Sequence, residues 1–193
     1  MPLHPAENRG YRELYLTGRQ AVKRFERLAA AFEGTETRSV LDKTAESIAR
    51  LLDELGPMTA RHDLYGGPSA QGSGANLGVV RGAVFDRFLE RNQALRFAVE
   101  DLEHTTTLLA YLAAVGEARG DQELPEFCRS WERRLRRQTG AVRKAAIELG
   151  ANPDAAVEPL DPSPAGRAAH RMAWAVGAVG EWTDRQVARR KRH

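Results

Sequence analysis

Two side chains in the sequence have types and a spacing that could hold a metal ion. Asp101 and His104 are three residues apart in an otherwise apolar row of a predicted helix, so both side chains would lie on one face. Carboxylate and imidazole groups suit iron or manganese. One hypothesis is a mononuclear metal site at Asp101 and His104, completed by Glu103, His62 or His170. The competing interpretation is a buried, hydrogen-bonded pair that fixes the register of the helix.

The single cysteine, Cys128, is the other residue whose side chain could take part in a reaction. It lies beside the predicted core face of a helix, which favours a small buried side chain over a nucleophile. One cysteine excludes an intrachain disulfide and a cysteine-clustered zinc or iron–sulfur site. The sequence contains no nucleophile elbow, metalloprotease helix motif or dinucleotide-binding fingerprint. No motif therefore supports catalysis, and we expect no resident cofactor beyond the possible single metal ion.

The basic residues give a second hypothesis, the binding of nucleic acid or another polyanion. The formal net charge is +3, and the excess lies in residues 161–193. Two groups could bind an anion: Arg133, Arg136, Arg137 and Arg143 on a predicted helix, and Arg189, Arg190, Lys191 and Arg192 at the end. Glutamates alternate with the first group, and the second group suits a solvated helix terminus. The sequence therefore favours weak binding at most and does not favour nucleic acid as a partner.

Apolar residues recur at helical spacing through most of the chain and predict an all-α protein. The expected helices cover residues 8–32, 36–62, 77–118, 123–149 and 165–188. Gly34 and Gly120 are expected to end helices. Residues 65–78 are rich in glycine and lack the Lys-Ser/Thr of a phosphate-binding loop, so we expect a flexible crossover. The third helix carries a second apolar row, which predicts that it is covered on two sides.

The chain is expected to divide after residue 150. Residues 1–150 would form the helical bundle, and residues 151–193 a proline-rich connector and a C-terminal helix that packs on the bundle or on a partner chain. A strip of small residues with two tryptophans nearby predicts a homodimer through this last helix. These residues are Gly166, Ala169, Ala173, Gly177 and Gly180, with Trp174 and Trp182. No secretion signal or membrane span is recognisable, which predicts a cytoplasmic protein without membrane association.

Two long helices, a glycine-rich crossover and two more long helices form the plan of a ferritin-like bundle. The stretches 15–55 and 95–124 also resemble the small stress-associated ferritin-like bundle proteins of bacteria, over about a third of the chain. The resemblance implies a ferritin-like up-down four-helix bundle with a glycine-rich crossover, an additional C-terminal helix, and a role in the stress response.

The same resemblance implies a di-metal centre, but most of its ligands are missing from this chain. Such a centre takes a carboxylate from each of two helices and a Glu-x-x-His pair from each of the other two. Only Glu103 and His104 match. The other expected ligand positions hold Gly18 and Arg19 in the first helix, Lys43 to Glu46 in the second, and Arg133, Arg134, Arg136 and Arg137 in the fourth. We therefore predict a non-enzymatic bundle that has lost the di-metal centre and has an interaction or stress-associated role.

Overall fold

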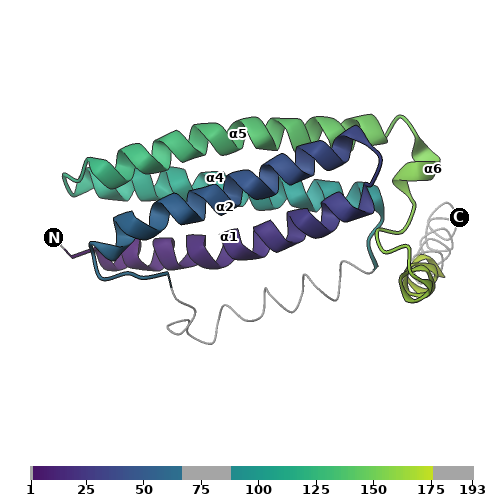
Figure 1. The fold of residues 1–193 in the computed structure, drawn as a ribbon, viewed down its shortest axis with the longest axis horizontal. Helices are drawn as coiled ribbons and strands as arrows, with labels where there is room; N and C mark the ends of the chain where they lie inside the picture. Colours follow the sequence, from purple (N-terminus) through teal and green to yellow (C-terminus); the bar gives the residue numbers. More distant parts are fainter. Residues whose placement is uncertain (1, 67–87, 176–193) are drawn as a thin grey trace, which may run out of the picture.

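The computed structural model describes residues 2–66 and 88–175, and these residues are mostly helical. Four long helices lie side by side: α1 (Pro5–Ala31), α2 (Glu36–Ala60), α4 (Arg91–Ala118) and α5 (Glu123–Leu149) (Figure 1). Within the described ranges there is no strand, only an isolated bridge between Glu90 and Pro159. The predicted all-helical class is confirmed.

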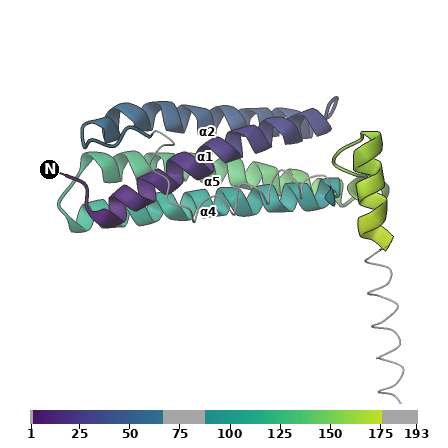
Figure 2. The same ribbon diagram turned by 90° about the horizontal axis from the view of Figure 1, so that it is seen from below.

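The four helices are arranged as two antiparallel hairpins. α1 packs beside α2 and α4, and α5 packs beside α2 and α4, so the helices occupy the corners of a square. Tyr15 near the start of α1 contacts Thr59 at the end of α2, and Glu7 contacts Arg119 at the end of α4. Both neighbours are thus antiparallel to α1, and α2 and α4 run in the same direction (Figures 1 and 2).

Local signals set the helix ends. Gly34 and Gly120 have φ values of +77° and +76°, in the left-handed region where glycine carries no side-chain penalty. α5 follows Asp121, whose Oδ1 accepts a hydrogen bond from the backbone N–H of Glu123 at 3.0 Å. α1 begins at Pro5, a few residues before the predicted start, because His4 and Glu7 form a capping box.

The start of α4 differs from the prediction. Residues 77–87 of the predicted third helix lie outside the described residues, and the helix begins only at Arg91. Its first turn meets the connector, because Arg91 N donates to Glu158 O at 2.9 Å and Leu160 N donates to Leu89 O at 2.9 Å. These backbone hydrogen bonds hold the residues before Arg91 in a non-helical conformation.

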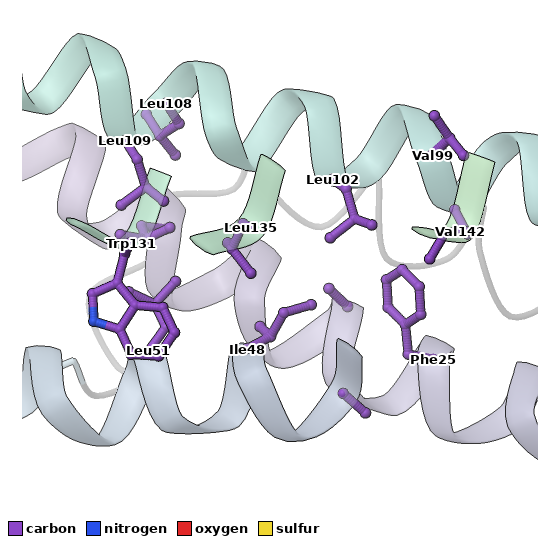
Figure 3. Packing of buried hydrophobic residues seen from close by; sticks show 14 of the residues in the cluster. Phe25, Ile48, Leu51, Val99, Leu102, Leu108, Leu109, Trp131, Leu135 and Val142 are labelled. Carbon is purple, nitrogen blue, oxygen red and sulfur yellow. The ribbon is translucent and has the colours of Figure 1, made fainter. Parts of the chain in front are cut away.

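The core runs the length of the bundle and takes apolar side chains from all four long helices (Figure 3). The largest fully buried side chains are Trp131, Tyr11, Phe25, Leu14, Leu28, Leu41, Ile48, Leu51, Leu55, Leu64, Leu95 and Leu102. Close packing of this kind supplies most of the stability of a helical bundle, because burial of apolar area is the dominant favourable term.

The second apolar row of α4 is only partly covered, so the prediction of cover on two sides is wrong within the described residues. Leu108 is buried, but the side chains of Phe97 and Tyr111 are 41% and 48% exposed. α4 occupies a corner of the square and buries the faces turned toward α1 and α5. Leu108 packs against α1 near Gly10, whereas Tyr111 lies at the open edge of that contact and stays half exposed.

The connector and last helix lie at one end of the bundle (Figure 2). The short helix α6 (Pro153–Ala156) contacts α4 and α5. The next helix covers residues 164–175 of the described part. It starts as predicted, because Ser163 Oγ accepts a hydrogen bond from Gly166 N at 3.0 Å. Gly177, Gly180, Trp182 and the basic end lie outside the described residues.

None of the helices in residues 2–66 and 88–175 combines the length and hydropathy that a membrane span requires.

Candidate functional site

The proposed metal ligands Asp101 and His104 make separate polar contacts with α1. Asp101 Oδ2 accepts a hydrogen bond from Arg24 Nη1 at 2.5 Å, and His104 Nε2 lies 3.1 Å from Glu13 Oε1. The His104 side chain is 53% exposed. The interpretation of a buried Asp101–His104 pair is therefore wrong, because both side chains sit at the outer edge of the α1–α4 contact and are held by α1.

The remaining proposed ligands do not converge on His104. Glu103 is exposed and pairs with Arg143 on α5. His62 follows the end of α2, while His170 lies on the helix at the opposite end of the bundle (Figure 1). The structure does not bring the five residues together. In the part of the chain that is described, no three His, Cys, Asp or Glu side chains are grouped so that they could hold a metal ion.

Apolar packing also occupies the positions where the resemblance would place di-metal ligands. A Cβ atom at Gly18 would lie 2.9 Å from Leu52 Cδ2, so α1 and α2 touch at this point. Thr44 is buried and donates its hydroxyl to Val40 O at 2.8 Å. Figure 3 shows Ile48, Leu102 and Leu135 filling the space between the helices. Of the carboxylates in residues 2–66 and 88–175, only Glu7 is fully buried.

Carboxylates neutralise much of the basic face of α5. Arg136 pairs with Glu132 and Arg143 with Glu103. Arg133 and Arg137 are exposed. The other basic side chains nearby are also occupied, since Arg129 pairs with Glu117, Lys144 with Glu148, and Arg134 stacks 4.3 Å from the Trp131 ring centroid. The glutamates that alternate with these arginines in the sequence thus pair with some of them in the structure.

The structure shows a buried polar cluster that the sequence analysis missed, formed by Glu7, Tyr11, Arg119 and Cys128. Tyr11 Oη lies 3.7 Å from Cys128 Sγ, and both residues are fully buried. Glu7, one turn before Tyr11 on α1, is also fully buried. Its Oε2 accepts hydrogen bonds from Arg119 Nη1 and from His4 N, the latter at 2.8 Å. Its Oε1 has no hydrogen-bond partner among the described residues.

Burial keeps the two ionisable groups at the centre of this cluster neutral. Burial is the main cause that raises the pKa of the Cys128 thiol to about 12; the contact with Tyr11 opposes this rise, and the charges of Asp121 and Glu7 add to it. Burial likewise raises the pKa of Tyr11 above its ordinary value. The thiolate is the nucleophilic form of cysteine, so a thiol held this way is unreactive. The interpretation of Cys128 as a small buried side chain is confirmed.

A local signal for part of this cluster is present in the sequence. His4 and Glu7 have capping-box spacing. The partner Arg119, however, lies 112 residues away from Glu7 in the chain. Only the packing of α1 against α4 reveals that the guanidinium and carboxylate meet.

An open apolar groove lies beside this cluster, between the start of α1 and the second half of α4. Its lining comprises His4, Ala6, Tyr111, Ala114, Val115, Ala118 and Arg119. A small-molecule site combines a concave apolar surface with several convergent polar groups. His4 and Arg119 reach this groove only at its edge, and both residues already make hydrogen bonds to Glu7.

Comparison of the chain with protein-family models, curated proteins and solved structures gave no match. The function must therefore be inferred from the arrangement of the side chains described above.

Proposed function

We propose that this protein acts by binding protein chains, as a ferritin-like helical bundle that has lost its di-metal centre, and not as an enzyme. The helix order supports the ferritin-like assignment, because two antiparallel hairpins with parallel middle helices need a long crossover between them. The side chains between the helices are apolar where the resembling proteins would carry ligands. The candidate ligands are instead paired with arginine or with glutamate.

The observation that carries the binding role is the exposure of two large apolar side chains on the helix over residues 164–175. Met172 and Trp174 are 69% and 68% exposed. The two residues are two positions apart and lie on either side of Ala173, and large exposed apolar side chains are common at interaction sites. Ala169 and Ala173 lie on the same helix, where small side chains let a second backbone approach closely.

The partner that we propose is a second copy of this chain. In a two-fold dimer the same helix from each copy would meet over the strip of Ala169 and Ala173, and the apolar side chains on either side of that strip, Met172 and Trp174, would be partly covered. The resemblance to stress-associated bundle proteins of bacteria supports a cytoplasmic role in a stress response for this dimer.

The test is the molar mass of the full chain in solution, measured by light scattering over a range of concentrations. We expect a dimer for the wild-type chain and a monomer for the double variant Met172→Glu, Trp174→Glu, because four buried carboxylates would oppose the contact. The matched control is Ile147→Glu, which changes a 70% exposed side chain on α5 and should leave the dimer intact. A double variant that keeps the wild-type mass would contradict the proposed interface, as would a wild-type monomer at every concentration.

A further inference from the structure

A row of basic side chains runs along α1 on the side of the α1–α2 hairpin that is turned away from α4 and α5. One side of α1 meets α2 at Gly18, and another side meets α4 at Gly10. The basic row, which consists of Arg12, Arg19 and Lys23, recurs at intervals of seven and four residues and lies on the remaining side.

The charges of the basic row are not neutralised by carboxylates. Arg12 Nε donates to the side-chain oxygen of Asn8 at 2.7 Å, and Arg19 Nη2 donates to the backbone oxygen of Gly66, so both acceptors are neutral. Lys23 is exposed and has no ion-pair partner among the described residues. The row therefore keeps its positive charge at the surface of the hairpin.

The neighbouring helix α2 carries a row of the opposite charge on the same side of the hairpin. The acidic row, which consists of Asp42, Glu46 and Asp53, recurs at intervals of four and seven residues. It lies on the side of α2 opposite Thr44, and Thr44 contacts Gln138 on α5. The acidic row is therefore turned away from α5, as the basic row is turned away from α4.

The two rows reflect an unequal distribution of charge between the two helices. α1 carries six basic and three acidic residues, whereas α2 carries three basic and five acidic residues. Glu46 and Asp53 are exposed and have no ion-pair partner in the described part of the chain, while Asp42 pairs with Arg38. Glu26 is the carboxylate of α1 that borders the basic row. The two excesses largely cancel in the sequence, so only the structure shows them as separate rows.

Opposite charges in adjacent rows make this face self-complementary about a two-fold axis parallel to the helices. Such an axis places α1 of each copy over α2 of the other copy, whereas an axis across the helices would bring like charges together. The contact of Gly18 with Leu52 sets the relative level of α1 and α2. Two pairs of opposite charges then lie level to within about one helical turn, Arg19 with Asp53 and Lys23 with Glu46.

We propose that the outer face of the α1–α2 hairpin binds the same face of a second copy, with each basic row against the acidic row of the partner. The helices are about 40 Å long and about 10 Å apart, so the face offers about 800 Å² per copy, which is the area that a standard interface buries on each partner. The helix over residues 164–175 lies at one end of the bundle, so this contact is separate from the dimer proposed above (Figure 2).

The molar mass of the full chain at low and high salt tests this contact. Raising sodium chloride from about 10 mM to about 1 M shortens the Debye length from about 30 Å to about 3 Å and screens exposed charge pairs. At a fixed protein concentration the mass measured by light scattering should fall to about half or less, because salt does not weaken an apolar contact of the last helix. An equal mass at both salt concentrations would overturn the proposal.

Two charge-reversed variants identify the rows. Arg19→Glu, Lys23→Glu gives both rows an excess of negative charge, and Glu46→Lys, Asp53→Lys gives both an excess of positive charge. At low salt each variant alone should have the mass that the wild-type chain has at high salt. An equimolar mixture should regain the wild-type mass, because each basic row again meets an acidic row. A mixture with no greater mass than its components would overturn the proposal.

The matched control is Arg133→Glu, Arg137→Glu on the exposed side of α5. It changes the net charge by the same amount as Arg19→Glu, Lys23→Glu and should keep the wild-type mass at low salt. A control that loses this mass would assign the effect to net charge and would also overturn the proposal. The salt measurement on the wild-type chain requires no substitution, so the test holds even if a variant does not fold.

Discussion

Tyr11 on α1 and Cys128 on α5 meet in the interior of the bundle, with 3.7 Å between the phenol oxygen and the sulfur. The two helices lie at diagonal corners of the square, so the contact crosses the core and does not follow a helix seam. Each group gives the other its hydrogen-bond partner. Without it, both would be polar atoms buried in an apolar core, which is costly.

The burial of these two groups predicts that stability falls in alkaline solution. The unfolded thiol loses its proton near its ordinary pKa of 9.0, whereas the folded thiol keeps it to about 12. Between these values the folded state binds more protons than the unfolded state, so the free energy of unfolding falls by about 1.4 kcal/mol per pH unit for this group. Tyr11 adds a further loss above its ordinary pKa of 10.0. Urea unfolding at several pH values checks this.

The control for that measurement is Cys128→Ala. The variant should be less stable at neutral pH because it leaves a small cavity. It should also lack the decline that begins near pH 9, while keeping the decline above pH 10 that Tyr11 causes. Identical pH profiles for the two proteins would contradict the assignment of the first decline to Cys128.

A pair of substitutions on α5 tests the core. Leu135 is fully buried between the helices, whereas Ile147 is 70% exposed. Leu135→Ala should lower the free energy of unfolding by about 2–5 kcal/mol, since it removes apolar contacts and leaves a cavity. Ile147→Ala should change it by about 0.5 kcal/mol or less. Denaturant unfolding of both variants is the measurement, and equal losses would show that the face of α5 is wrongly assigned.

Two helical glycines should respond to alanine in opposite directions. A Cβ atom at Gly116 would lie 2.7 Å from Pro125 Cγ, so Gly116→Ala should force α4 and α5 apart and cost about 1–3 kcal/mol. A Cβ atom at Gly140 would meet nothing within 4 Å, so Gly140→Ala should stabilise the protein by about 0.5–1 kcal/mol. Thermal unfolding followed by circular dichroism measures both. A stabilising Gly116→Ala would contradict the close approach of the helices.

Iron content tests the proposed loss of the di-metal centre. Protein purified from iron-replete cells should contain well under two irons per chain, because Asp101 and His104 are held by Arg24 and Glu13 in separate pairs. Elemental analysis after dialysis gives the stoichiometry. Two irons per chain that survive dialysis would show that the ligand positions were wrongly assigned.

Within the described residues, the sequence alone was sufficient for the four long helices and most of their ends. Helical periodicity and capping are local properties, set by residues within a few positions of one another. Gly34 and Gly120 end helices as predicted, and Ser163 caps the helix that follows it. Trp131, Leu135 and Val142 form one apolar stripe at helical spacing on α5 and are all buried, because one strong stripe fixes which side of a helix turns inward.

Only the tertiary structure decided how the polar side chains pair. His104 faces Glu13, Asp101 faces Arg24, and Glu7 is buried beneath Arg119, although each pair is far apart in the chain. The partner of a side chain at the edge of a helix depends on the rotation and axial position of the neighbouring helix. Periodicity does not specify either quantity, since it gives the buried face of each helix separately. The exposure of Phe97 and Tyr111 follows from the same cause, because the square arrangement of four helices determines which of two apolar rows on α4 is covered.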